Sequence, residues 1–93
     1  MTTAEVARHV RVSFRQLDYW VRFGLLPIVD RRPGTGSKRL WSASEIHSAE
    51  VMAALVHAGV TPHAAAEALQ TAVVGSTAFV VQLGRLWLTG PLP

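Results

Sequence analysis

The 93-residue sequence contains no cysteine, which excludes a disulfide framework, a Cys-based zinc site and a thiol nucleophile. It also lacks an apolar run of roughly 18 residues, the length needed for a membrane-spanning helix. The first residues include Glu5 and Arg8 and do not have the form of a signal peptide. These absences predict a cytoplasmic protein, and the length predicts one small domain with a modest core.

Negative charge is scarce in the first half of the sequence. Positions 1–41 hold eight of the nine Lys and Arg residues and three acidic ones, a formal balance of 8 − 3 = +5, whereas positions 42–93 balance at 1 − 3 = −2. This one-sided distribution favours a basic face that meets a polyanion. An ordinary solvated surface would give the same charge count. The placement of the basic residues therefore has to distinguish a polyanion-binding face from such a surface.

Constellations for catalysis are missing as well. The segment PGTGSK has neither the spacing nor the strand-to-helix context of a phosphate-binding loop. His47 and His57 fall on one predicted helix, but ten residues apart, with no carboxylate spaced to join both. The histidines are therefore interpreted as surface or packing residues, and we expect no enzyme activity, no metal site and no cofactor.

The N-terminal quarter predicts two short helices joined by a tight turn. One helix covers about residues 2–9, with Val6 and Val10 facing inward. The other runs from residue 13 to about residue 23, and Gly24 is its left-handed stop. Each begins with a capping box, formed by Thr2 with Glu5 and by Ser13 with Gln16. This pattern is that of a helix-turn-helix.

The remaining sequence predicts a basic hairpin, two further helices and a C-terminal hairpin. Residues 28–41 contain two strand-like runs around the turn RRPGTGSK. A helix starts at Ser42 and ends near Ala58, and Thr61 caps a fourth helix over about residues 62–72. The tail around Gly84 favours two short strands, although its apolar residues also fit helical spacing. The apolar stripe of the third helix is Ile46, Ala49, Met52, Ala53 and Val56.

The second predicted helix has an inner and an outer stripe. With a rotation of about 100° per residue, Phe14, Leu17 and Val21 fall on one side, followed by Leu25. This apolar stripe is expected to pack against the first helix. The adjacent stripe faces outward and consists of Arg15, Asp18, Tyr19 and Arg22.

The outer stripe has the chemistry of a helix that reads DNA. Arg15, near the helix N-terminus, can donate two hydrogen bonds to a guanine in the major groove. Tyr19 and Arg22 suit phosphate oxygens, and Gln16, at the border, can reach an adenine. Asp18 has two interpretations: it pairs with Arg15 or Arg22 and orients them, or it accepts a hydrogen bond from a cytosine amine.

The basic hairpin strengthens this interpretation because it directly follows the helix-turn-helix. A charged surface hairpin is common by itself, but in this position it is typical of a wing that lies over the sugar-phosphate backbone or enters the minor groove. The expected DNA contacts of this wing are Arg31, Arg32, Lys38 and Arg39.

Residues 3–70 contain four parts with a common family pattern: EVARHVRVSFRQLDYWVRFGLL, the basic hairpin, RLWSASEI and HAGVTPHAAAEAL. Together they resemble the DNA-binding domain of the MerR family of winged helix-turn-helix regulators. The resemblance implies base-edge contacts near Arg15, phosphate contacts by Tyr19 and the wing arginines, and a wing braced by Trp20 and Trp41. The expected contacts of the recognition helix are Ser13, Arg15, Gln16, Asp18, Tyr19 and Arg22.

We therefore expect a mainly α-helical fold with small β-hairpins. Residues 1–72 would form a winged helix-turn-helix of four helices plus wing. Residues 73–93 would form an apolar C-terminal extension, folded as a β-hairpin that packs on the helices or mediates self-association.

Three departures from the family pattern stand out. Arg11 occupies a turn position that is usually glycine, at a cost of about 1 kcal/mol if its backbone is left-handed, and its guanidinium can reach a phosphate. Asp18 stands where a basic residue is common. The long dimerisation helix and effector domain of full regulators are missing, so we expect no small-molecule effector.

The expected function is sequence-specific binding of double-stranded DNA by a small transcription regulator. One alternative is an excisionase-like recombination directionality factor that bends DNA, and a second is a protein-interaction module. The expected partners are duplex DNA, further copies of the chain as a homodimer or tandem array on DNA, and an integrase or RNA polymerase. Such a protein would be nucleoid-associated in the cytoplasm, with no membrane partner.

Overall fold

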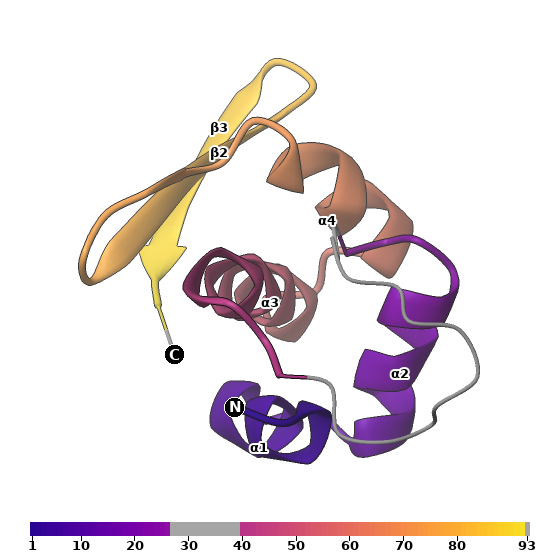
Figure 1. Cartoon of the computed structure of the whole chain (residues 1–93). Coiled ribbons are helices and arrows are strands. Elements are labelled where there is room, and N and C mark those ends of the chain that lie inside the picture. The colour runs from indigo at the N-terminus through magenta and orange to yellow at the C-terminus, as the bar shows by residue number, and fades with distance from the viewer. Residues whose placement is uncertain (27–39, 93) are drawn as a thin grey trace.

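The structure, a computed structural model, describes residues 1–26 and 40–92. It confirms a mainly α-helical fold with a small antiparallel sheet. Figure 1 shows α3 in the centre, α1 and α2 below it and to its right, and the sheet at the upper left. The elements are α1 (Thr3–Val10), α2 (Phe14–Arg22), α3 (Ala43–His57), α4 (Pro62–Leu69), β1 (Val73–Val74), β2 (Ala78–Leu83) and β3 (Leu86–Pro91).

Reciprocal capping boxes start α1, as predicted, and also α3, whereas at the start of α2 only the Ser13 half of the predicted Ser13–Gln16 box is present. The backbone N–H of Thr2 donates to the Glu5 carboxylate at 2.8 Å, and the N–H of Glu5 donates to Thr2 Oγ1 at 3.3 Å. The hydrogen bond from the Thr2 backbone lowers the pKa of the Glu5 carboxyl. Ser42 and Glu45 repeat the arrangement at the start of α3, at 2.8 and 3.2 Å. Local sequence therefore determines where α1 and α3 begin.

The turn between α1 and α2 is closed by backbone hydrogen bonds. The backbone of Arg11 is left-handed, with φ 63° and ψ 43°. This is the conformation for which the turn position usually has glycine. The N–H groups of Arg11 and Val12 donate to the carbonyls of Arg8 and Ala7 at 3.3 and 3.0 Å. Ser13 then caps α2 by accepting from a backbone N–H at 3.0 Å. The chain thus changes direction within the short turn that the sequence predicts.

The buried side of α2 is rotated relative to the prediction. Leu17 and Trp20 are 0% and 1% exposed, whereas Phe14, which we expected in the inner stripe, is 56% exposed. The buried arc is centred between Leu17 and Trp20, about 60° from the predicted centre. Phe14, at the first helical position, therefore lies outside it, while Val21 and Leu25 are partly buried at its margin.

Helix α3 is buried around most of its circumference rather than along one stripe. The predicted stripe is buried or partly buried, but it describes only part of the contact surface. The reason is that α1 and α4 both pack against α3. The buried residues of α3 are Glu45, Ala49, Glu50, Val51, Met52, Ala53 and Leu55.

The described helices are short, the longest having 15 residues. Helix α4 starts after its Thr61 cap as predicted but ends at Leu69, earlier than expected. It buries Ala65 and Ala68, whose small side chains allow a close approach to neighbouring elements. None of the helices in residues 1–26 and 40–92 is long and apolar enough to cross a membrane.

The tail forms the predicted hairpin, and β1 extends it to an antiparallel sheet with the order β1-β2-β3. Phe79 and Val81 of β2 are 3% and 0% exposed, and β2 packs on α4. Gly90 pairs with Phe79, and a Cβ there would stand only 3.0 Å from the phenyl ring. A glycine is thus needed opposite Phe79. Because residues 78–91 form strands, the helical alternative for the tail was wrong.

The segment after the predicted wing is anchored to α1. The wing itself falls on residues 27–39, outside the described residues, and stays a prediction. Trp41 is 5% exposed, and its backbone N–H donates to the Met1 carbonyl at 2.8 Å. This contact joins the residues before α1 to the residues before α3.

Arg11→Gly is expected to raise the free energy of unfolding by about 1 kcal/mol, because glycine removes the left-handed strain while loosening the unfolded chain slightly. Urea denaturation followed by circular dichroism measures the change. Arg8→Gly, inside α1, is the control and should lower the free energy of unfolding by about 1 kcal/mol. A destabilised Arg11→Gly protein would contradict the strain assigned to this turn.

Candidate nucleic-acid interface

The exposed side of α2 gathers two cations, a phenol and a carboxylate. Arg15 and Arg22 are exposed, and Tyr19 is 45% exposed. Asp18 lies between them and is partly exposed. We call these four residues the outer face of α2. Burial of the opposite side at Leu17 keeps this face directed away from the core, so the predicted outer stripe is one surface.

Asp18 and Arg22 form an ion pair along the outer face. Arg22 Nη2 lies 3.2 Å from Asp18 Oδ2, one helical turn away. The two side chains are 73% and 41% exposed, so water screens the pair and its contribution is about 0.5 kcal/mol or less. Asp18 thus pairs with Arg22, one of the two arginine partners considered. A pair this weak can open when a phosphate approaches Arg22.

Aromatic rings extend the outer face at both ends. Tyr19 and Phe23 lie with ring centroids 4.4 Å apart and planes inclined by 32°. Phe23 is 63% exposed, and Phe14, at the other end of α2, is 56% exposed. The sequence interpretation missed both phenylalanines as surface groups. The four-residue spacing from Tyr19 to Phe23 was a usable signal, because such residues are neighbours on a helix.

The turn before α2 adds polar groups beside the outer face. The Arg11 side chain is exposed at the left-handed turn. Ser13 Oγ accepts the backbone N–H of Gln16 at 3.0 Å, which leaves its hydroxyl hydrogen able to donate. Gln16 is partly buried at the border of the face. Two of these predicted contact residues therefore come just before α2 in the sequence and the third borders the outer face, with Gln16 the least accessible.

The two tryptophans predicted to brace the wing occupy core positions. Trp20 is 1% exposed, and Trp41 Nε1 donates to Thr3 Oγ1 at 3.1 Å. Their contact with a wing stays a prediction. The predicted wing residues lie outside the part of the chain that the structure describes: Arg31, Arg32, Lys38 and Arg39.

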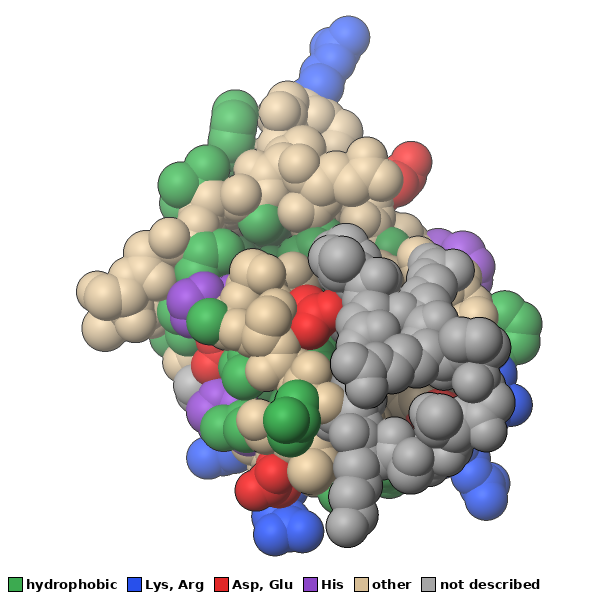
Figure 2. Space-filling view, in the orientation of Figure 1, with side chains coloured by type: hydrophobic (Ala, Val, Ile, Leu, Met, Phe, Trp, Pro, Cys, Tyr) green, Lys and Arg blue, Asp and Glu red, His purple; other side chains and the backbone are tan. Residues whose placement is uncertain are grey.

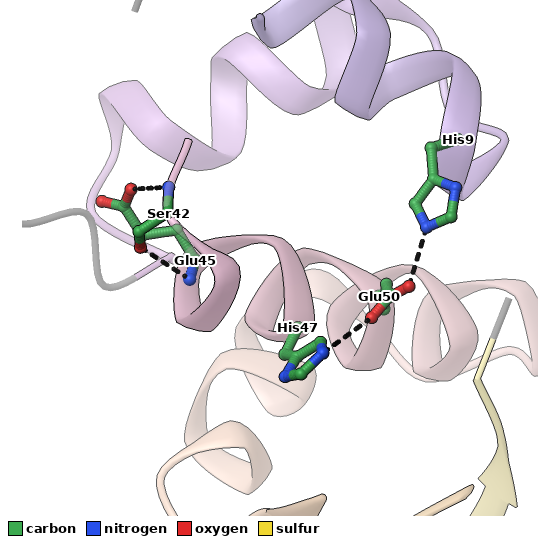
Figure 3. Close-up of polar contacts among 5 residues, drawn as sticks. All are labelled: His9, Ser42, Glu45, His47 and Glu50. Carbon is green, nitrogen blue, oxygen red and sulfur yellow. Dashed lines mark hydrogen bonds and ion pairs between the residues drawn. The ribbon is translucent and has the colours of Figure 1, made fainter. Parts of the chain in front are cut away.

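A buried carboxylate lies between two histidines where α3 meets α1. Glu50 is 7% exposed. Its Oε2 lies 2.7 Å from His9 Nε2, and its Oε1 lies 4.0 Å from His47 Nε2 (Figure 3). His57 Nε2 contacts the Val10 carbonyl at 3.2 Å. These are polar contacts to a buried carboxylate and to a backbone carbonyl, and neither the burial of Glu50 nor its contact with His9 was predicted. Within residues 1–26 and 40–92, no group of three or more His, Asp or Glu side chains is placed to hold a metal ion.

The sequence profile described as "MerR HTH family regulatory protein" matches residues 1–72. The matched range includes α1, the turn, the outer face of α2, α3 and α4, and it ends just before β1. The family resemblance read from the sequence is therefore confirmed over most of the chain.

Three curated relatives, from Mycobacterium bovis and from two strains of Mycobacterium tuberculosis, are described as uncharacterized HTH-type transcriptional regulators. Each is 36% identical to this chain over 53 residues. The aligned part is 56% of this chain and 24% of each relative, so the chain matches about a quarter of the length of these relatives. No solved structure gives a significant match.

His9→Ala is expected to lower the free energy of unfolding by about 1–3 kcal/mol, because it removes the 2.7 Å partner of the buried Glu50 carboxylate. Urea denaturation measures the loss. His63→Ala, an exposed histidine of α4, is the control and should change stability by less than about 0.5 kcal/mol. Equal stability of the two variants would show that the His9–Glu50 contact contributes nothing.

Proposed function

Because the chain belongs to the MerR HTH family of regulatory proteins, we propose that it binds double-stranded DNA sequence-specifically as a transcription regulator. The observation that carries this proposal is the outer face of α2, where Arg15, Tyr19 and Arg22 share one exposed side. In a helix-turn-helix, the second helix is the one that enters the major groove. The exposed side of α2 would then meet the bases.

The distribution of exposed charge supports the proposal. Arg8, Arg11, Arg15 and Arg22 are all exposed on α1, the turn and α2. They belong to the half of the sequence with a balance of +5, whereas the other half balances at −2. Attraction between such cations and the phosphate backbone drives association and falls steeply as salt rises. The asymmetry would turn the α2 end of the molecule toward the duplex.

The order of side chains along α2 separates base contacts from backbone contacts. Arg15, in the first turn, suits a guanine edge, which a guanidinium binds with two hydrogen bonds. Tyr19 and Arg22, one and two turns further, suit phosphate oxygens. Arg11 and Ser13, before the helix, have exposed donors for a flanking phosphate. Sequence preference would therefore depend chiefly on Arg15.

The basic hairpin extends the proposal to a second DNA contact. As a wing, its residues would bind the backbone or the minor groove without reading base edges. The proposed contacts are Arg31, Arg32, Lys38 and Arg39. Trp20 and Trp41, which are buried on either side of this segment in the sequence, would support it.

Asp18 is proposed to restrain Arg22 rather than to read a base. Its carboxylate already lies 3.2 Å from the Arg22 guanidinium, which is a satisfied arrangement in the free protein. The pair lowers the net positive charge of the outer face. The affinity of α2 for phosphate is then weaker than that of a helix with two unpaired arginines. The base preference given by Arg15 therefore contributes a larger share of the binding energy.

Arg15→Ala is expected to lose about 1–3 kcal/mol of discrimination between the preferred site and a scrambled duplex, because it removes the base-edge contact. Arg39→Ala should weaken both duplexes alike and reduce the salt slope by about 1. The site is first selected from a random duplex pool, and affinities are then measured by fluorescence anisotropy over a salt series.

Arg85→Ala is the matched control, because Arg85 lies in the β2–β3 turn and is the one Lys or Arg outside the first 41 positions. It should bind like the parent protein. Absence of duplex binding at low salt would overturn the proposed function. Parent-like binding by both Arg15→Ala and Arg39→Ala would overturn only the placement of the contacts.

Asp18→Asn is expected to strengthen binding to selected and scrambled duplexes alike, by roughly 0.5–1 kcal/mol, since it frees Arg22 and removes a negative charge facing phosphate. Glu67→Gln, an exposed change of the same charge on α4, is the control for net charge. A repeated selection with the variant checks the preferred site. A changed base preference together with weaker binding would show that Asp18 reads a cytosine instead.

A further inference from the structure

Strand β3 is an edge strand with no partner on its outer side among the described residues. The sheet order is β1-β2-β3, and β3 pairs with β2 along its whole length. The sheet is not part of the helix-turn-helix, and it lies on the side of the molecule away from α2 (Figure 1). An unpaired edge of this kind is a ready template for a further strand.

The hydrogen-bond pattern shows which backbone groups of β3 face the open edge. The Leu92 N–H donates to the Thr77 carbonyl at 2.9 Å. Because hydrogen-bonded pairs alternate in an antiparallel ladder, Leu88 and Gly90 also point their backbone groups toward β2. The N–H and C=O groups of Trp87 and Thr89 therefore point outward, toward the open edge.

The open edge of β3 lacks the charges that often protect edge strands, and its one proline, Pro91, stands at the end of the strand. Natural edge strands often carry charged residues that block pairing, yet residues 68–92 contain one charged side chain, Arg85, in the turn before β3. Trp87 is 65% exposed and Leu86 is 65% exposed. Figure 2 shows hydrophobic side chains standing exposed over the sheet at the upper left of the view.

We propose that β3 pairs antiparallel with β3 of a second copy of this chain, forming a twofold dimer with one continuous sheet. The axis passes beside Leu88, so that Trp87 lies opposite the partner's Thr89 and Thr89 opposite the partner's Trp87. Each of these pairs exchanges two backbone hydrogen bonds, which satisfies the outward N–H and C=O groups of Trp87 and Thr89 in both strands. The two Trp87 rings become diagonal neighbours on one face of the sheet, within reach of each other.

The ends of β3 select this register. A shift toward the C-terminus would place Pro91, which has no N–H, opposite the partner's Trp87. A shift toward the N-terminus would bring the turn residue Arg85 into the ladder, opposite the partner's Thr89. In the proposed register Arg85 stays beyond the hydrogen-bonded pairs, so no like charges meet across the seam.

The size of the contact predicts a weak and reversible dimer. An aromatic side chain buries about 150–250 Å² when it is fully covered, and Trp87 has 65% of its surface left to cover. Together with Leu86 and the strand backbone, each copy would bury a few hundred Å², less than the roughly 800 Å² per partner of a standard interface. Self-association is therefore expected at high micromolar concentrations, not at nanomolar ones.

Sedimentation velocity of the parent chain without DNA, from micromolar to millimolar concentration, tests the proposal independently of DNA binding. The parent should shift from monomer to dimer as concentration rises. Trp87→Lys should stay monomeric throughout, because it places two ammonium groups at the seam. Val73→Lys is the matched control: Val73 is 67% exposed on the opposite edge strand β1, and its variant should dimerise like the parent.

Circular dichroism of both lysine variants verifies that they are folded. A parent that remains monomeric up to millimolar concentration would overturn the proposal. Dimerisation of Trp87→Lys to the parental extent would also overturn it. Loss of dimerisation in both lysine variants would overturn it too, because it would assign the contact to the face of the sheet and not to the β3 edge.

A cysteine cross-link provides a second measurement that does not depend on the lysine variants. The parent has no cysteine, so Leu88→Cys introduces one thiol per chain. Residues facing each other at such a non-hydrogen-bonded pair have Cα atoms about 4.5 Å apart, which suits a disulfide. Mild oxidation should cross-link Leu88→Cys at least tenfold faster than Val73→Cys. Equal rates would place the second copy elsewhere and overturn the β3 register.

Discussion

The burial of α3 is the constraint on which the remaining structure depends. Glu50 is buried among the apolar residues of this helix, and a carboxylate removed from water needs a hydrogen-bonding partner. His9 at the end of α1 supplies one at 2.7 Å. At the N-terminal end of α1, Thr3 accepts a hydrogen bond from the indole N–H of Trp41. Trp41 directly precedes the capping box that starts α3. Helix α1 is therefore attached to α3 near both of its ends, and its apolar residues fill the space between these contacts.

Fixing α1 in this way also determines where α2 lies. The turn between them is short and uses Arg11 in a left-handed conformation, which an L-residue adopts only when its surroundings impose it. A helix of nine residues has little stability of its own, so α2 depends on Leu17 and Trp20, which are inserted into the core. Apolar contacts on one side thus hold the charged outer face in place on the other. The DNA-facing chemistry proposed for α2 is a consequence of packing as much as of charge.

The features that could be predicted from the sequence are those whose partners are close in the chain. Capping residues act three positions apart, and Asp18–Arg22 and Tyr19–Phe23 are neighbours one helical turn apart. The outer face of α2 was therefore predictable from spacing. The burial of Glu50 could not be predicted, because its partner His9 is 41 residues away. A local sequence pattern assigns a glutamate to the surface. The exposure of Phe14 was missed because angular spacing gives the relative position of residues on a helix, but not which side the other elements cover.

The positions of charge along the molecule connect the two proposed surfaces. The molecule is 40 Å long. Helix α2, whose sequence contains Arg15 and Arg22, lies on the opposite side from the nearly uncharged sheet (Figure 1). A net charge of +3 would make two copies repel each other if it lay at the contact. Charges separated by more than about 8–10 Å are largely screened at physiological salt. Because the arginines of α2 lie away from β3, one end would attract a polyanion while the other would pair with a second copy, and neither of these proposed interactions would weaken the other.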